Sequence, residues 1–137
     1  MAKKQITLPK LKAKVQVVFN KYIRLRDSGG GFFDCIACGI TKSTDVMNAG
    51  HFYAVKGYDG IRFDEDNVHG ECASCNCWDQ SHLIGYAIRL EVKLCTDGLQ
   101  ALHDRAAEYK KDSNFKWSRA ELEEKLVHYN LRLKFIN

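Results

Sequence analysis

The sequence predicts an α+β fold in which a small, irregular β-rich segment is framed by helices. Amphipathic helical periodicity flanks residues 32–70 on both sides, whereas that interval has no helical period and is punctuated by glycines. Two Cys-x2-Cys motifs near the ends of the interval indicate a bound metal ion. The 137 residues fit one compact domain with three parts: a basic N-terminal helix and hinge (1–31), a cysteine-bracketed module (32–94) and a C-terminal helical extension (95–137).

The first helix is expected to begin at Pro9, a residue suited to the first turn of a helix. Apolar residues then recur at steps of four and three and form one seam: Leu11, Val15, Val18, Tyr22 and Leu25. The run Ser28–Gly31 should end this helix, and its three glycines predict a flexible hinge.

Three further helices are expected after the β-rich segment. The second covers residues 74–94, and Thr96 with Asp97 is typical of the cap of a third. Ser118 and Glu121 have the spacing of a capping box and predict the start of a fourth. The first and fourth helices share a heptad-like apolar spacing, so one of them can pair with a second chain instead of its own body, and the sequence leaves this open.

The formal net charge of +4 conceals an asymmetry along the chain. Residues 1–26 carry eight basic side chains and no acidic one, whereas the remaining 111 residues hold 13 Lys and Arg against 17 Asp and Glu. Such a run is often only a solvated helix face, but it can also meet phosphates. The residues expected to contact a DNA backbone are Lys10, Lys14, Lys21, Arg24 and Arg62.

The six cysteines are better explained by metal than by disulfides. No apolar stretch reaches the length of a membrane span, and the basic N-terminus lacks the apolar core of a secretory signal, so we expect a protein of the reducing cytoplasm. The two Cys-x2-Cys pairs, separated by 33 residues, can supply four thiolates in tetrahedral geometry: Cys35, Cys38, Cys72 and Cys75. Four sulfur ligands close a zinc ion to substrate, which predicts a structural role. Cys77 and Cys95 are left over, and Cys95 is interpreted as a small apolar residue at a helix end.

The order of polar residues between the cysteine pairs is informative. A strand-like MNAGHFYAV carries His51, the loop string DEDNVH follows, and Asn76 comes directly after the fourth cysteine. This order resembles the HNH, or ββα-metal, nuclease motif, and the surrounding cysteines are similar to those of phage recombination endonuclease VII. The strings AGHFY, IRFDEDNVHGECASCN and LIGYAIRL look like the NinG/Rap recombination nucleases of lambdoid phages, over about residues 35–94.

The resemblance implies a zinc-stabilised ββα-metal core and an endonuclease that cuts branched recombination intermediates, such as Holliday junctions and D-loops, leaving 5′-phosphates. It implies that His51 activates a water molecule as general base and that Asn76 binds the catalytic Mg²⁺ or Mn²⁺. Asn67 would orient the imidazole or brace the loop. The role of His69 is left open: it can be a second catalytic histidine, a phosphate contact or a hydrogen-bonded core residue. The other histidines lie in the expected helices and are assigned to the surface: His82, His103 and His128.

The chain departs from these patterns at the expected carboxylate. Enzymes similar to endonuclease VII carry an aspartate directly before the catalytic histidine, where this chain has Gly50, and NinG-like sequences carry one three residues before it, where this chain has Asn48. Asn48 and Asp45 are the expected additional metal ligands, and Asp66 or Glu71 can also compensate for the missing carboxylate. A lysine common in NinG-like sequences is replaced by Asp79.

Two other functions fit the same residues. One is an HNH nuclease of the homing or restriction type that reads a sequence in linear duplex, and the other is a zinc module that binds DNA without cutting it. For the preferred function, two cuts at a four-way junction favour a homodimer. The resemblance also implies a phage or prophage protein that acts in the cytoplasm of a bacterial host.

Overall fold

In the computed structural model, which describes residues 4–112 and 114–136, helix α1 runs over Leu8–Arg26. Its start is fixed by Thr7, whose hydroxyl accepts a hydrogen bond from the amide of Lys10. The helix buries one continuous face, formed by Leu11, Val15, Phe19, Tyr22 and Ile23. The predicted seam is therefore right at its beginning and wrong at its end, because Leu25 is 40% exposed and Ile23 takes the core position.

The glycine run forms a tight turn where the sequence predicted a hinge. Strands β1 (Ser28–Gly29) and β2 (Phe32–Asp34) pair antiparallel, and β3 (Thr41–Ser43) completes the sheet. Gly30 and Gly31 join the first two strands with φ values of 60° and 86°. Two successive positive φ values match the twist of a two-residue hairpin, so these glycines are required by a hydrogen-bonded turn.

A second, two-stranded ribbon contains the residues of the predicted site. A 3-10 helix, η1 (Thr44–Val46), leads into β4 (Met47–His51), and a loop that contains η2 (Asp59–Ile61) leads into β5 (Val68–Cys72). The strands are antiparallel. Because directly opposite residues point to the same face, Asn48 shares one face with Glu71, and His51 shares the other with Val68.

The single helix predicted over residues 74–94 is interrupted. The short α2 (Ala73–Trp78) ends before Asp79, and α3 (His82–Lys111) begins three residues later. Within α3 the backbone of Cys95 has φ 63° and ψ 167°, which kinks the helix where the sequence predicted the boundary between two helices. Cys95, interpreted as a small apolar residue at a helix end, is exposed at this kink inside α3.

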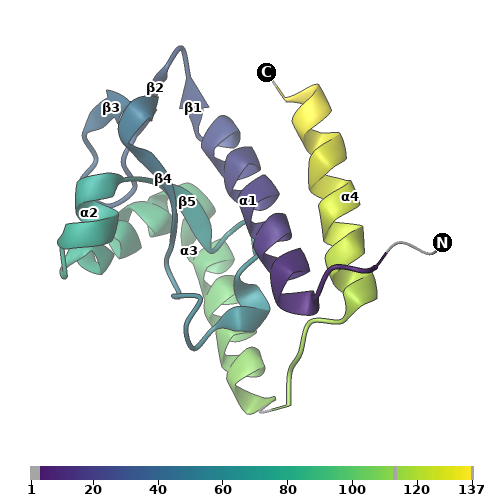
Figure 1. Cartoon of the computed structure of the whole chain (residues 1–137). Coiled ribbons are helices and arrows are strands. Elements are labelled where there is room, and N and C mark those ends of the chain that lie inside the picture. Colours follow the sequence, from purple (N-terminus) through teal and green to yellow (C-terminus); the bar gives the residue numbers. More distant parts are fainter. Residues whose placement is uncertain (1–3, 113, 137) are drawn as a thin grey trace.

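Helix α4 (Arg119–Phe135) begins with the predicted capping box, in which the Ser118 hydroxyl and Glu121 carboxylate each accept a backbone amide bond from the other residue. Figure 1 shows α4 lying beside α1 and running in the same direction. The Phe19 and Tyr129 rings meet edge to face, with centroids 4.9 Å apart. The two heptad-like seams therefore pack against each other within one chain.

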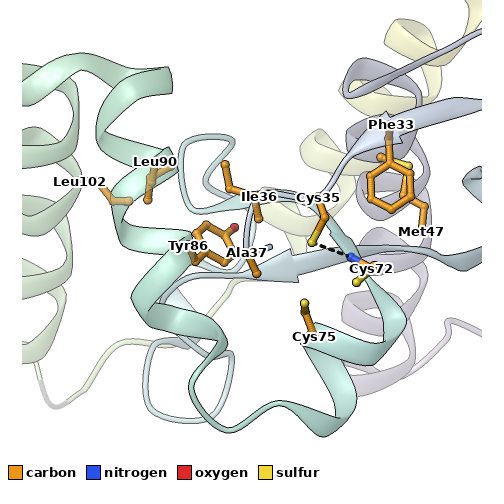
Figure 2. Close-up of a cluster of buried hydrophobic side chains, with 10 residues drawn as sticks. All are labelled: Phe33, Cys35, Ile36, Ala37, Met47, Cys72, Cys75, Tyr86, Leu90 and Leu102. Atoms are coloured by element: carbon orange, nitrogen blue, oxygen red, sulfur yellow. Dashed lines mark hydrogen bonds between the residues drawn. The ribbon is translucent and has the colours of Figure 1, made fainter. Parts of the chain in front are cut away.

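Two apolar clusters hold the elements together. One joins α1, α4 and the His51 face of the ribbon, including Val68. The other surrounds the cysteines with residues of β2, β4 and α3, and Figure 2 shows Cys35, Cys72 and Cys75 close to Tyr86. Over the part of the chain that the structure describes, no helix has the length and apolar character needed to cross a membrane.

Candidate metal centre and adjoining polar site

The four predicted cysteines converge on one point. Cys35 and Cys38 come from the turn that follows β2, Cys72 ends β5 and Cys75 lies in α2. All four Sγ atoms lie within 4.8 Å of one another. Sulfur atoms bound to one zinc ion at about 2.3 Å in tetrahedral geometry would be about 3.8 Å apart, so a small contraction suffices. Among the His, Cys, Asp and Glu side chains of the described residues, these four cysteines are the group of three or more whose ligand atoms lie within 4.8 Å of one another. The quartet could hold a metal ion such as zinc.

The surroundings of Cys72 favour its thiolate form. Lys42 Nζ lies 3.2 Å and Ser74 Oγ 3.4 Å from the Cys72 sulfur. Burial raises the pKa of Cys72, but the hydrogen bonds from Ser74, the Cys75 amide and Lys42 outweigh burial and lower the pKa to about 6. Since a metal binds the thiolate and not the thiol, these contacts prepare the site for a cation.

His51 ends β4 and is half-buried against the loop. Its Nε2 lies 3.0 Å from the carbonyl oxygen of Arg62, so Nε2 carries the proton and donates it. Burial lowers the pKa of His51, which keeps the imidazole neutral near pH 7. Nδ1 is then the nitrogen with a free lone pair, as a proton acceptor requires.

Asn67 fastens the loop between β4 and β5. Its side-chain oxygen accepts a hydrogen bond from the amide of Tyr53 at 2.8 Å, and its Nδ2 donates to the carbonyls of Tyr53 and Ile61. The side chain is fully buried, so these bonds replace those with water. Of the two roles predicted for Asn67, these hydrogen bonds fit bracing of the loop.

His69 is a buried member of a charged network, on the ribbon face opposite to His51. Its Nε2 donates to the Asp66 carbonyl at 2.8 Å, and its Nδ1 faces Lys93 Nζ at 2.8 Å and Arg26 Nη2 at 3.1 Å. Burial and the Lys93 charge lower the pKa of His69 to about 4. These contacts match the third of its predicted roles, a hydrogen-bonded core residue.

Glu71 and His82 form a pair that the sequence did not reveal. The Glu71 side chain is completely buried, and its Oε2 lies 2.5 Å from His82 Nδ1. Burial raises the pKa of Glu71, although the hydrogen bond from His82 acts in the opposite direction. The other carboxylate oxygen, Oε1, is buried without any hydrogen-bond partner. The prediction that His82 is a surface residue is therefore wrong, since its side chain is only 19% exposed.

Of the remaining predicted ligands, Asn76 and Asn48 lie at α2, whereas Asp45 lies in η1. Asn76 is exposed and lines a hollow of about 480 Å³ together with residues that include Asp79 and His82. Asn48 reaches α2 from β4, where its Nδ2 lies 3.8 Å from the sulfur of Cys77. Asp45 is exposed in η1, and its amide donates to the Ser43 hydroxyl. The structure thus brings Asn48 and Asn76 to the same short helix.

The basic side chains of α1 form a stripe opposite its buried face. Lys10, Lys14 and Lys21 are exposed and Arg24 is half-buried, and these four residues are called the α1 basic stripe below. Arg62 differs from them, because its guanidinium donates to Gln16 at 2.8 Å and to Asp59 at 2.9 Å. Its side chain is 15% exposed, so it is placed to hold the loop against α1.

Fold and site together define a class: a mixed α+β protein in which a strand–loop–strand–helix unit is fastened at its base by a four-cysteine cluster. The family described as "Bacteriophage Lambda NinG protein" matches residues 2–137. The chain belongs to the NinG family. This family match agrees with the resemblance to NinG-like sequences that the residues around His51 and Asn76 show.

The curated relatives are phage proteins named Protein ninG. The protein from Salmonella phage P22 is 28% identical over 121 residues, which cover 88% of this chain and 55% of the relative. The protein from Escherichia phage lambda is 30% identical over 95 residues, covering 67% of this chain and 45% of the relative. The chain therefore spans about half the length of these relatives. No solved structure matches.

Proposed function

We propose that the protein is a metal-dependent DNA endonuclease that cuts branched recombination intermediates through an HNH, or ββα-metal, site on β4, β5 and α2. The supporting observation is the succession of strand, braced loop, strand and helix directly at the cysteine quartet. His51 ends the first strand, Asn67 fastens the loop and Asn76 lies on the helix, in the order that the HNH resemblance predicts.

In this proposal His51 is the general base. Its neutral imidazole donates Nε2–H to the Arg62 carbonyl, and this bond fixes the tautomer and leaves Nδ1 to take a proton from the attacking water. The amide oxygen of Asn76 is a hard ligand suited to Mg²⁺ or Mn²⁺. Such an ion, when bound, supplies positive charge that stabilises the phosphorane-like transition state.

The two halves of the proposed site lie on different faces of the ribbon. His51 shares its face with Val68, whereas Asn48 points toward α2. The ribbon is only two strands wide, so the edge of β4 is not covered by a further strand of this sheet. In this proposal, a phosphate seated across the edge and end of β4 meets the imidazole on one side and the cation on the other.

The proposed metal in the cysteine quartet is zinc, with a structural role. Four thiolates complete the coordination of a zinc ion and leave no open position for substrate. The ion would join the turn after β2 to the start of α2, and so would fix the helix that carries Asn76.

The proposed partner is DNA, which the α1 basic stripe would contact through its backbone phosphates. Two cuts at a four-way junction require two active sites, so a homodimer is part of the proposal. Since the relatives are phage proteins, the expected setting is a bacterial host during phage recombination.

The test is cleavage of an end-labelled four-way junction and a matching linear duplex in Mg²⁺ or Mn²⁺. The comparison uses His51→Ala and, as the control, His128→Ala, which removes an exposed imidazole on α4. Cutting of the junction alone, abolished only by His51→Ala, is the expected result. Equal cutting of both substrates would favour an HNH nuclease that reads linear duplex. Binding of the DNA without cutting would favour the other alternative, a zinc-containing module that binds DNA.

A further inference from the structure

We infer that Glu71 supplies the carboxylate ligand of a divalent cation, with the Asn48 amide oxygen as its partner and His82 as the residue that positions the carboxylate. The inference rests on the proposed function for the reaction that the cation serves. The cation site itself can be tested by metal binding alone, without any measurement of DNA cleavage, because this chain supplies all of the residues named.

The strand register places Asn48 and Glu71 together. They are directly opposite in the β4–β5 pair, so their side chains point to the same face and their Cβ atoms are about 5 Å apart. The Asn48 Nδ2 is directed at Cys77, which leaves the amide oxygen available. Oxygen ligands of Mg²⁺ lie about 2.1 Å from the ion, so a pair of side chains at this spacing can share one cation.

The Glu71 carboxylate has an unused oxygen. The side chain has no exposed surface, Oε2 is occupied by His82, and Oε1 has no hydrogen-bond partner. Leaving a carboxyl oxygen buried without a partner is costly, and a bound cation removes that cost. The orphaned oxygen therefore fits the donor set of a divalent ion better than a purely structural role.

Gly50 explains how the carboxylate reaches this position. A Cβ on Gly50 would overlap Glu71 Oε1, so the absence of a side chain on β4 makes room for the carboxylate from β5. The carboxylate of β5 thereby occupies the space beside β4 that a side chain at position 50 would fill.

His82 fixes the carboxylate and is itself partly exposed. Its Nδ1 contacts Glu71 Oε2 at 2.5 Å, and His82 also lines the hollow that contains Asn76. A carboxylate held by an imidazole is a common outer-shell arrangement at metal sites. A hydrated ion entering through this hollow meets the imidazole first, and Mn²⁺ accepts nitrogen ligands more readily than Mg²⁺. Mn²⁺ is therefore the better probe.

The experiment is a titration of the zinc-loaded full chain with Mn²⁺, followed by the electron paramagnetic resonance signal of the free ion. Wild type should bind one Mn²⁺, and Glu71→Gln should weaken binding at least tenfold, because it removes the charge and keeps the shape. The matched control is Glu65→Gln, since Glu65 is a half-buried carboxylate that accepts a hydrogen bond from Tyr129 outside the site. Unchanged Mn²⁺ affinity in Glu71→Gln would overturn the inference.

A further variant separates a ligand from a merely structural residue. Asn48→Asp should raise Mn²⁺ affinity several-fold, since it adds a second carboxylate opposite Glu71. If Glu71→Gln does not fold, Asn48→Asp decides, and an affinity that is unchanged or lower would contradict the inference.

The outcomes also distinguish this inference from the proposed nuclease. Glu71-dependent Mn²⁺ binding without cleavage of any DNA would support the cation site and contradict the endonuclease function. Junction cleavage that is equally fast in Glu71→Gln would support the endonuclease function and contradict the role of Glu71 as a ligand.

Discussion

The carboxylate of Asp27, directly after α1, accepts a hydrogen bond of 2.8 Å from the amide of Gly70 in β5. Arg26 holds the same carboxylate through two bonds of 2.7 and 3.0 Å, and Lys93 from α3 approaches it at 3.1 Å. Asp27 therefore ties the first helix to the ribbon and to α3 at one point. Burial raises the pKa of Asp27, but Arg26 and Lys93 outweigh burial and lower the pKa to about 2.

Asp27→Asn should lower the free energy of unfolding by about 2 kcal/mol at pH 7, because a pKa of about 2 against the ordinary 3.8 stabilises the charged fold by this amount. Urea unfolding of both proteins measures the difference. The difference should persist above pH 4 and shrink as the pH falls through about 2. The exposed Asp97→Asn is the control, and an equal effect of both variants would contradict this role of Asp27.

His69 should make the fold sensitive to mild acid. The unfolded chain takes up a proton on this imidazole near pH 6.5, whereas the folded chain does so only near pH 4, so stability is full above pH 6.5 and falls as the pH drops toward 4. The loss amounts to about 3 kcal/mol.

The measurement is the free energy of unfolding of wild type and His69→Gln across this pH range, at equal zinc content. His69→Gln should show a shallower decline, whatever its stability at pH 7. Parallel curves for the two proteins would rule out His69 as the source.

Removal of the proposed zinc ion should loosen the turn after β2 and the start of α2. A chelator, or Cys38→Ser, should lower the melting temperature by about 10 °C or more, because a site of this kind contributes several kcal/mol of folding free energy. Circular dichroism and the zinc-to-protein ratio measure the effect. Cys95→Ser, which changes an exposed thiol outside the quartet, should leave both quantities unchanged. A melting temperature that is indifferent to the chelator would argue against a structural ion.

The α1 basic stripe should determine the salt dependence of DNA binding. Replacing Lys14 and Lys21 by Gln should weaken binding to junction and duplex alike and reduce the slope of log affinity against log salt by about 2. Fluorescence anisotropy at several salt concentrations measures this slope. Lys111→Gln, at the end of α3, is the control. An unchanged slope would place the DNA on another surface.

Features encoded by local signals were predicted well. The capping box of Ser118 and Glu121 is formed as expected, because both of its hydrogen bonds lie within one turn of the chain. The four-cysteine cluster also follows from spacing, since each Cys-x2-Cys pair presents two sulfur atoms to one point. The family resemblance, which rests on whole strings of residues, agrees with the family match.

Features that depend on distant contacts were missed. His82 has no sequence signal that distinguishes it from a surface histidine, because its partner Glu71 lies on a strand whose position relative to α3 only the folded chain defines. The break between α2 and α3 lacks a proline or glycine, so helical periodicity continues through it. Gly30 and Gly31 fit a hinge or a hairpin turn equally well until the strands on either side are seen to pair.

The pairing of α1 with α4 has a consequence for synthesis on the ribosome. The Tyr22 hydroxyl contacts Arg132, a partner 110 residues later in the chain. At translation rates of about 5 to 20 residues per second, the apolar face of α1 waits roughly 5 to 20 s for the helix that covers it. During that interval the nascent chain presents an uncovered amphipathic segment.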